Sequence, residues 1–261
     1  MNVDASVPNA ARVYDFFLGG KDNYASDREL AQKILAILPD TADVCRDNRA
    51  FLQRAVRFLA GQAGVRQFLD IGTGLPTMGN VHEIAQGTAP GARVAYVDYD
   101  PVVLAHARAL LARDSDVIVA AGDLRKPEAI LADADVRQLI DFSQPVAVLI
   151  LAVLHFVPDA DRPFAAVRTI VDALPPGSYL VLTQSTPDEV PAHVTAAMKD
   201  AYSGASAQVT PRSAEEIARF FDGLDLIDPG LVNVTLWRPD QPSATPRRSL
   251  IYGGVARKTL G

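Results

Sequence analysis

A short apolar run that ends in two glycines constrains this chain more than any other feature. Residues 67–74 read Gln-Phe-Leu-Asp-Ile-Gly-Thr-Gly, and an apolar run of this kind is typical of a buried parallel strand. Gly72 and Gly74 allow a tight turn that approaches a ligand closely, because glycine has no Cβ atom. Thr77 can cap a helix over residues 81–85. Strand, glycine turn and helix together predict the first half of a nucleotide-binding βαβ unit.

Three classes of ligand use turns of this geometry, and the residue types distinguish them. A P-loop needs a lysine after its second glycine; Gly74 and Gly79 have the spacing, but Asn80 replaces the lysine. The dinucleotide-binding pattern needs a small third residue, where this chain has Thr77. With Asp70 before the glycines, the order resembles motif I of the S-adenosylmethionine (SAM)-dependent methyltransferases with a Rossmann-like fold. A structural turn without a ligand is the remaining alternative.

Composition narrows the class of protein. The 261 residues, 49% of them hydrophobic, suffice for one large α/β domain or a domain with a modest appendage. A net charge of −6 argues against nucleic acid as the main partner. The longest apolar run, 146–154, is too short to span a bilayer, and we expect no secretory leader. Cys45 is the only cysteine, which fits a reducing compartment. We therefore expect a cytoplasmic protein with neither nucleic-acid nor membrane partners.

Two helices are predicted before the glycine turn. A capping box at Ser26–Glu29 opens a helix that stops at Pro39, and a second helix covers residues 43–60. Residues 1–62 are thus predicted to form an N-terminal helical extension, which can act as a lid. The main domain is predicted over residues 63–261, and its polar, proline-interrupted section at about 184–210 is predicted to cover the substrate.

Further apolar runs predict the other strands of a parallel sheet, followed by closing strands at the C-terminal end. The parallel strands are expected at 67–71, 92–97, 116–121, 145–154 and 178–183, and the closing strands at 224–227, 232–237 and 250–256. Helices are expected between them at 102–113, 127–139, 161–174 and from Ser213 to Phe221. The run at 145–154 lacks alternation, which indicates a central strand buried on both faces.

Carboxylates follow the second and third strands. Asp98 ends the second strand at the spacing where nucleotide-binding βαβ units place a ribose-binding acid; a second solvated cap is the alternative. Asp100 and Pro101 instead match an N-cap and first helical position. Gly122 and Asp123 follow the third strand and fit the methyltransferase position that reads the adenine amino group, although a turn aspartate would look the same.

The fourth strand leads into His155-Phe156-Val157-Pro158-Asp159, much like the methyltransferase motif in which a strand breaks beside the methyl donor. His155 is the best-placed candidate for a general base, since an unperturbed histidine titrates near neutrality. A structural role for this histidine is the alternative, and the sequence leaves both open. No cluster of histidine, cysteine and carboxylate has metal-ligand spacing.

The whole chain resembles the actinobacterial S-adenosyl methyltransferase family, formerly a domain of unknown function, within the class I Rossmann-like SAM-dependent methyltransferases. The matching segments include 11–15, 18–23, 69–77, 80–82, 96–101 and 220–224. The resemblance implies a doubly wound, mostly parallel seven-stranded sheet with an antiparallel last strand, helices on both faces and bound SAM. The cofactor-binding residues expected from it are Asp70, Gly72, Thr73, Gly74, Asp98, Tyr99, Gly122, Asp123, Leu124 and Ala152.

One departure concerns the glycine loop. Where many methyltransferases carry a third glycine, this chain has Pro76, so the methionine end of the cofactor is expected to use other groups, with Arg12 or Asp22 as candidates. The expected reaction is in-line methyl transfer to an unidentified small molecule, with the cofactor carrying the chemistry. A SAM-binding sensor without transferase activity and a nicotinamide-dependent oxidoreductase are the alternative functions.

Overall fold

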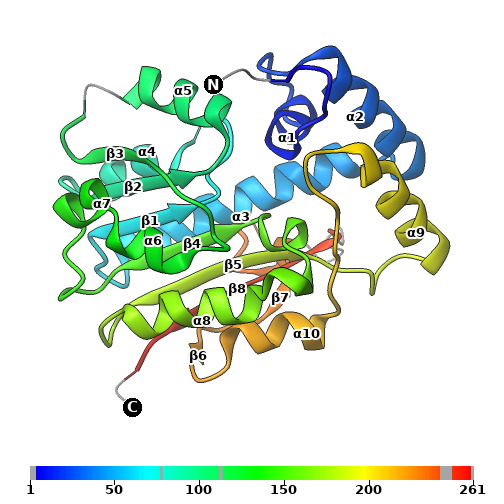
Figure 1. Ribbon diagram of the computed structural model, residues 1–261. Coiled ribbons are helices and arrows are strands. Elements are labelled where there is room, and N and C mark those ends of the chain that lie inside the picture. The colour runs from blue at the N-terminus through cyan, green and yellow to red at the C-terminus, as the bar shows by residue number, and fades with distance from the viewer. Residues whose placement is uncertain (1–3, 77–78, 112–113, 242–248, 260–261) are drawn as a thin grey trace.

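The computed structural model describes residues 4–76, 79–111, 114–241 and 249–259. A single mixed sheet runs through the molecule, with helices on both of its faces (Figure 1). Its strands are β1 (Gln67–Ile71), β2 (Arg93–Asp98), β3 (Val117–Ala121), β4 (Ala147–Leu151), β5 (Tyr179–Ser185), β6 (Asp225–Leu226), β7 (Val232–Asn233) and β8 (Ile251–Arg257).

The strand order is β3-β2-β1-β4-β5-β8-β6, and strands β1 to β5 are parallel. Strand β8 runs antiparallel to β5, so the predicted doubly wound sheet with an antiparallel end is confirmed. Both β6 and β7 pair with β8, whose other edge is taken by β5. The described residues therefore form eight strands rather than seven, because the last edge position is divided between two short strands.

Helices pack on both faces of the sheet. The helices are α1 (Ala10–Phe17), α2 (Ala25–Ile37), α3 (Thr41–Gly61), α4 (Val81–Thr88), α5 (Pro101–Leu111), α6 (Pro127–Ala132), α7 (Ala134–Leu139), α8 (Pro163–Ala173), α9 (Ala192–Ala201) and α10 (Ala214–Ala218). Helices α3 and α4 pack on one face around the buried Phe51, and α6, α7, α8 and α10 pack on the other around Ile170. Burying such side chains stabilises the fold by about 1.5–3 kcal/mol each.

A third apolar cluster joins the N-terminal helices to the segment around α9. Val13 of α1, Ile34 of α2 and Tyr202, just after α9, are buried together. The backbone N–H of Ser206 also donates to the carbonyl of Pro8, at 2.9 Å. In Figure 1 α1, α2 and α9 lie on the same side of the molecule. The N-terminal extension and the section at 184–210 are thus packed against each other.

Element boundaries differ from the predictions where local contacts decide them. Helix α2 begins at Ala25, and the Asp27 carboxylate accepts from the N–H of Tyr24, at 2.7 Å, so the capping acid is Asp27 rather than Glu29. Strand β4 ends at Leu151, because Ala152 adopts a left-handed conformation with φ 56°. Residues 127–139 form two helices because Asp133 caps the second one.

Two further predictions concern helix starts and the last strands. The predicted cap Thr77 lies outside the described residues; α4 begins at Val81 after a capping box of Asn80 and Glu83. Of the predicted strand 232–237, only β7 is extended, because residues 234–236 form a 3₁₀ turn. The predicted N-cap role of Asp100 is confirmed, since its carboxylate accepts from the N–H of Val102, at 2.7 Å.

Candidate active site

A cavity of about 130 Å³, here called the central cavity, lies at the carboxyl ends of β1, β2 and β4. The chain order reverses between β1 and β4, and open parallel sheets bind ligands at such a switch point. Helices α1 and α3 close the cavity from the other side. Its lining residues include Asn9, Tyr14, Asp15, Asn48, Arg49, Asp70, Gly72, Thr73, Gly74, Asp98, Tyr99 and Ala152.

The glycine turn at the floor of this cavity is held in a conformation that only glycine adopts easily. Gly72 has φ 75°, and a Cβ atom on it would lie 2.3 Å from Cγ2 of Val153. Its N–H donates to the carbonyl of Val97, at 2.7 Å, which ties the turn to β2. Gly74 has φ 66°, and nothing within 4 Å would meet its Cβ. The backbone at Gly74 therefore faces open space.

Asp98 organises the edge of β2. One of its carboxylate oxygens accepts from the N–H of Gly74 and the other from the N–H of Asp100, both at 2.9 Å. Burial raises the pKa of Asp98, and these backbone hydrogen bonds oppose that effect. The two carboxylate oxygens can together accept about four hydrogen bonds, so a further donor can still bind Asp98. Asp98 thus fixes the glycine turn and also lines the central cavity.

A second cavity of about 260 Å³, the side cavity, lies along the ends of β2 and β3 and shares Gly72, Asp98 and Tyr99 with the lining of the central cavity. Asp98 and Asp123 both line it, together with Gly122, Leu124 and Tyr99. Burial raises the pKa of Asp123, but hydrogen bonds from Arg125 outweigh that effect and hold it below its usual value. The two predicted acids therefore face a shared cavity.

Asp70 is the most perturbed carboxyl group of the central cavity. It is buried at the end of β1, and this burial raises its pKa to about 7, while the nearby Arg49 cation opposes the increase. A buried carboxylate without full compensation attracts a cation. Beside the glycine turn the central cavity therefore offers an acid that a bound cation would favour in its ionised form.

Comparison with known families and structures decides the class of protein. A family model described as S-adenosyl methyltransferase matches residues 1–259. The chain belongs to the S-adenosyl methyltransferase family. A Thermobifida fusca protein described as a candidate methyltransferase is 44% identical, with a TM-score of 0.91 over 98% of this chain and 97% of its own. Among curated proteins no match was found.

Two other solved structures are similar to this chain, the first in sequence and fold and the second in fold alone. A DUF574 family protein from Streptomyces avermitilis is 39% identical and has a TM-score of 0.93, covering 98% of this chain and 100% of that protein. Human N-acetylserotonin methyltransferase, solved in complex with SAM, shares the fold at 14% identity and a TM-score of 0.52, over 97% of this chain and 63% of that protein. The chain is therefore a SAM-dependent methyltransferase with a Rossmann-like fold.

The cavities of this methyltransferase fit SAM in their chemistry. SAM carries a ribose diol, a sulfonium, an ammonium and a carboxylate. Asp98 is a carboxylate at a strand end, Asp70 is a buried acid with a raised pKa, and the backbone at Gly74 faces open space. Arg49, which also lines the central cavity, supplies a positive charge. Carboxyl groups, a guanidinium group and an open stretch of backbone therefore line the same cavity.

A third cavity, here called the apolar cavity, adjoins the central one and contains His155. It lies among α1, α3, α9 and the ends of β4 and β5, and shares Tyr14, Ala152 and Phe156 with the central cavity. Burial, with a contribution from Arg212, lowers the pKa of His155 to about 3. Its Nδ1 accepts from the N–H of Ser185, at 3.4 Å. His155 is therefore neutral at pH 7 and a weak base in this conformation.

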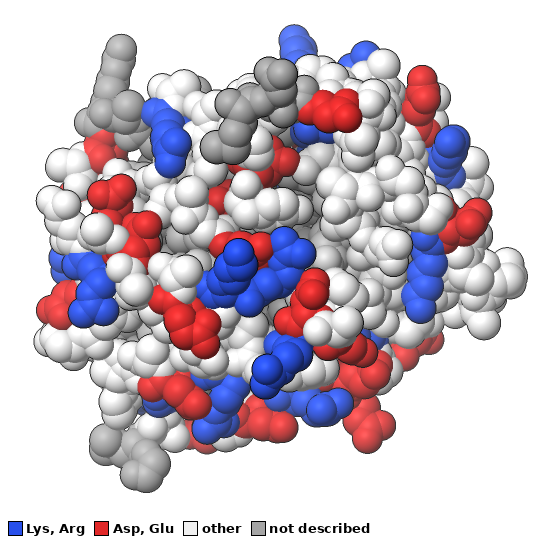
Figure 2. All heavy atoms as spheres, viewed as in Figure 1, with Lys and Arg blue, Asp and Glu red and all other residues white. Residues whose placement is uncertain are grey.

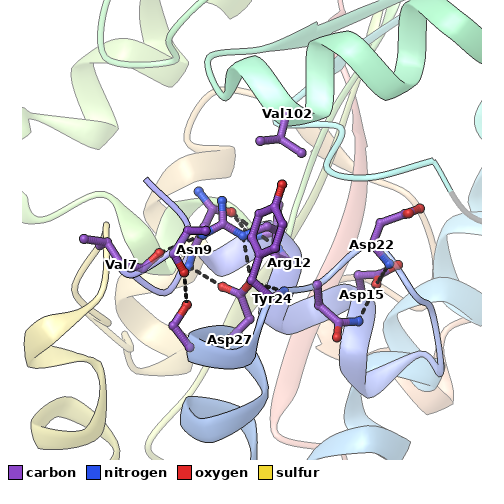
Figure 3. Close-up of polar contacts among 12 residues, drawn as sticks. Val7, Asn9, Arg12, Asp15, Asp22, Tyr24, Asp27 and Val102 are labelled. Carbon is purple, nitrogen blue, oxygen red and sulfur yellow. Dashed lines mark hydrogen bonds and ion pairs between the residues drawn. The ribbon is translucent and has the colours of Figure 1, made fainter. Parts of the chain in front are cut away.

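Arg12 is not among the residues that line the central cavity. Its Nε donates to the Asp27 carboxylate, at 2.7 Å, and both side chains are buried. It also donates to the carbonyl of Val7, at 2.7 Å, and its guanidinium lies 5.0 Å from the ring centroid of Tyr24. Figure 3 shows this group between α1 and the first turn of α2. Arg12 ties the extension together, so the predicted contact with the cofactor has no support in this geometry.

Residues that the sequence reasoning missed line the central cavity from α1 and α3. Asn48 accepts from Thr183 Oγ1, at 2.8 Å, and donates to the Tyr14 hydroxyl, at 3.0 Å. Thr183 in turn accepts from the N–H of Ala152, at 2.8 Å. This chain of hydrogen bonds links the end of β4 to α1. Asn48 falls at helical spacing among the buried Cys45, Phe51 and Leu52 of α3, and a polar residue on this buried face was the signal that could have revealed it.

The described residues contain no helix long and apolar enough to cross a membrane. Within the same described ranges, no three or more histidine, cysteine and acidic side chains are grouped so as to hold a metal ion. Acidic and basic side chains are interspersed on the face shown in Figure 2. On that face, therefore, no continuous basic stripe marks a nucleic-acid surface.

Proposed function

We propose that this methyltransferase binds SAM across the side and central cavities and transfers its methyl group, in line, to a small-molecule acceptor. The observation that carries the proposal is the placement of Asp70, Asp98 and Asp123, which end three neighbouring strands or follow them and line two cavities that share Asp98. The order of these acids along the sheet matches the order of cation, ribose and base in the cofactor.

The nucleoside part is assigned to the side cavity. Asp98 accepts hydrogen bonds from the ribose hydroxyls, as strand-end acids do in nucleotide-binding βαβ units. Asp123 accepts from the adenine amino group, while Leu124 and the half-exposed Tyr99 ring contact the faces of the base. Gly122 also lines the side cavity, and it packs closely on the core, since a Cβ atom on it would lie 2.7 Å from Val97 Cγ1.

The amino-acid part is assigned to the central cavity. Asp70 and Asp15, both buried acids in its lining, hold the ammonium group. Arg49 holds the carboxylate, because it is the arginine that lines this cavity. The open backbone at Thr73 and Gly74 approaches the same end. Charges of both signs lie where a zwitterion needs them.

The chain contributes position and shelter rather than acid or base catalysis. When bound, SAM supplies a methyl group that a nucleophile takes as the carbon–sulfur bond breaks. Ala152, in its left-handed conformation, and the Tyr14 side chain lie at the boundary between the central and apolar cavities. They fix the direction from which an acceptor meets the methyl group. Because its low pKa makes His155 a weak base, we do not assign it the proton transfer. We keep it as a candidate group for binding the acceptor.

Calorimetry with S-adenosylhomocysteine tests the proposal. Wild-type protein is expected to bind it, and Asp98→Asn is expected to bind it at least tenfold more weakly, because charge-assisted hydrogen bonds are worth about 1.5–3 kcal/mol. Asp116→Asn, an acid that lies outside both cavities, serves as the matched control. Equal affinity in all three proteins would remove the assignment. Tight cofactor binding with no turnover on any acceptor would instead favour a sensor.

A further inference from the structure

The apolar cavity has a chemical character that the cofactor does not explain. We propose that it binds the methyl acceptor, and that the acceptor is an uncharged molecule about the size of one six-membered ring with a polar group. The inference rests on the proposed function, because Tyr14, Ala152 and Phe156 line this cavity and the central cavity alike. A molecule held here lies next to the site assigned to the methyl donor.

The charge of the acceptor follows from the lining. No aspartate, glutamate, lysine or arginine is among the described residues that line the apolar cavity. Its histidine, His155, has a pKa lowered by burial and is neutral at pH 7. Moving an unpaired ion from water into such surroundings costs several kcal/mol. A charged acceptor is therefore rejected and an uncharged one is admitted.

The polar group of the acceptor follows from two hydroxyls. Ser185 Oγ at the end of β5 and Thr195 Oγ1 on α9 are buried and have no hydrogen-bond partner in the described part of the chain. Both residues line the apolar cavity. A buried polar group without a hydrogen-bond partner is unfavourable, so such groups usually have one. A hydroxyl or other neutral polar group on the acceptor supplies that partner.

The size of the acceptor follows from the volume. The apolar cavity measures about 130 Å³, close to the roughly 150 Å³ of an engineered apolar cavity that binds benzene. Val44, Val194 and Met198 are among its apolar lining residues. One ring with a short polar substituent fits this space, whereas a long aliphatic chain exceeds it.

Binding of four probes tests the charge and the size separately. Calorimetry is done on wild-type protein saturated with S-adenosylhomocysteine, using benzyl alcohol, benzoate, benzylamine and decan-1-ol. Benzyl alcohol is expected to bind at least tenfold more tightly than the two charged analogues of the same ring and than decanol. Phenol, indole and cyclohexanol extend the uncharged set. Equal binding of the charged analogues, preferred binding of decanol, or no binding of any uncharged ring compound would overturn the inference.

Substitutions on α9 test whether benzyl alcohol binds in the apolar cavity. Val194→Phe fills the space and is expected to abolish benzyl alcohol binding, while Ala196→Phe on the exposed side of α9 leaves it unchanged. Thr195→Val is expected to weaken binding about fivefold by removing one hydrogen bond, and Thr195→Ser to restore it. Equal affinities in all these variants would contradict the location.

The affinity for S-adenosylhomocysteine, measured first, separates two kinds of failure. If wild-type protein does not bind it, the proposed function fails. If S-adenosylhomocysteine binds normally and the ring compounds do not, only the acceptor assignment fails.

Discussion

Replacing Asp70 by asparagine separates the stability of the free protein from its affinity for the cofactor. Burial raises the pKa of this carboxyl from 3.8 to about 7. Between about pH 4 and pH 7 the folded protein therefore binds more protons than the unfolded chain, so stability falls as pH rises through this window. Above pH 7 the full cost of the buried charge is present. Asparagine has a similar shape and carries no charge.

The magnitude follows from the two pKa values. The difference between 3.8 and about 7 corresponds to about 4 kcal/mol at roughly 1.4 kcal/mol for each pH unit. This is an upper limit, since the amide must replace the carboxylate hydrogen bonds. Urea unfolding at pH 8 is expected to show Asp70→Asn as more stable than wild type by up to that amount. The difference is expected to shrink toward pH 4.

Ligand affinity is expected to move in the opposite direction. The ammonium group of S-adenosylhomocysteine stays protonated from pH 6 to pH 8, and it needs Asp70 in its ionised form. With a pKa of about 7, wild-type affinity should rise roughly tenfold over this range. The Asp70→Asn protein should bind more weakly at pH 8. Adenosine, which lacks the amino-acid part, is the control ligand, because it also reports any titration of Asp98.

The ratio of the affinity for S-adenosylhomocysteine to the affinity for adenosine isolates the contribution of Asp70 to binding. A ratio that does not change with pH in wild-type protein would refute the reasoning. So would an Asp70→Asn protein that binds S-adenosylhomocysteine as tightly as wild type at pH 8. Calorimetry in buffers of matched ionic strength measures both ligands.

Other predictions follow from buried contacts. Arg12→Ala is expected to destabilise the protein by about 3–5 kcal/mol, because it leaves Asp27 buried without its cation; removing both side chains as Arg12→Met with Asp27→Leu should cost less, and thermal unfolding compares them. Gly72→Ala is expected to abolish cofactor binding, since its Cβ meets Val153 and its φ of 75° is strained. The double variant Gly72→Ala with Val153→Ala should recover little of the cofactor affinity, because the backbone strain at position 72 remains. The affinity of both variants for S-adenosylhomocysteine measures this. Because the pKa of His155 is lowered to about 3, His155→Phe is expected to leave the pH profile of turnover above pH 5 unchanged, whereas loss of the fall in turnover at low pH would assign His155 the role of general base.

The parts of the fold that sequence predicted are those specified by local patterns. The run at 67–71 is β1 because every one of its side chains is buried, and a run without alternation records such burial. Asp100 caps α5 because its carboxylate reaches the N–H of Val102, two residues away. These contacts are short in sequence, so residue type and spacing are sufficient to predict them.

The parts that sequence did not predict depend on distant contacts. Strand β4 stops early at Ala152, whose N–H donates to Thr183 on the neighbouring strand. Arg12 and Arg49 look equally available in the sequence, but Asp27 occupies Arg12 while Arg49 lines the central cavity. No local sequence pattern predicts that Arg12 is paired with Asp27 and that Arg49 lines the cavity. The site acids were predictable because strand ends meet at one edge of a parallel sheet.

The central claim is that the nucleoside lies across the carboxyl ends of neighbouring parallel strands. A crystal structure of the protein soaked with S-adenosylhomocysteine tests this directly. The account predicts both ribose hydroxyls within hydrogen-bond distance of the Asp98 carboxylate and the adenine amino group at Asp123. A nucleoside bound anywhere else, with these two carboxylates making no contact to it, would contradict the account.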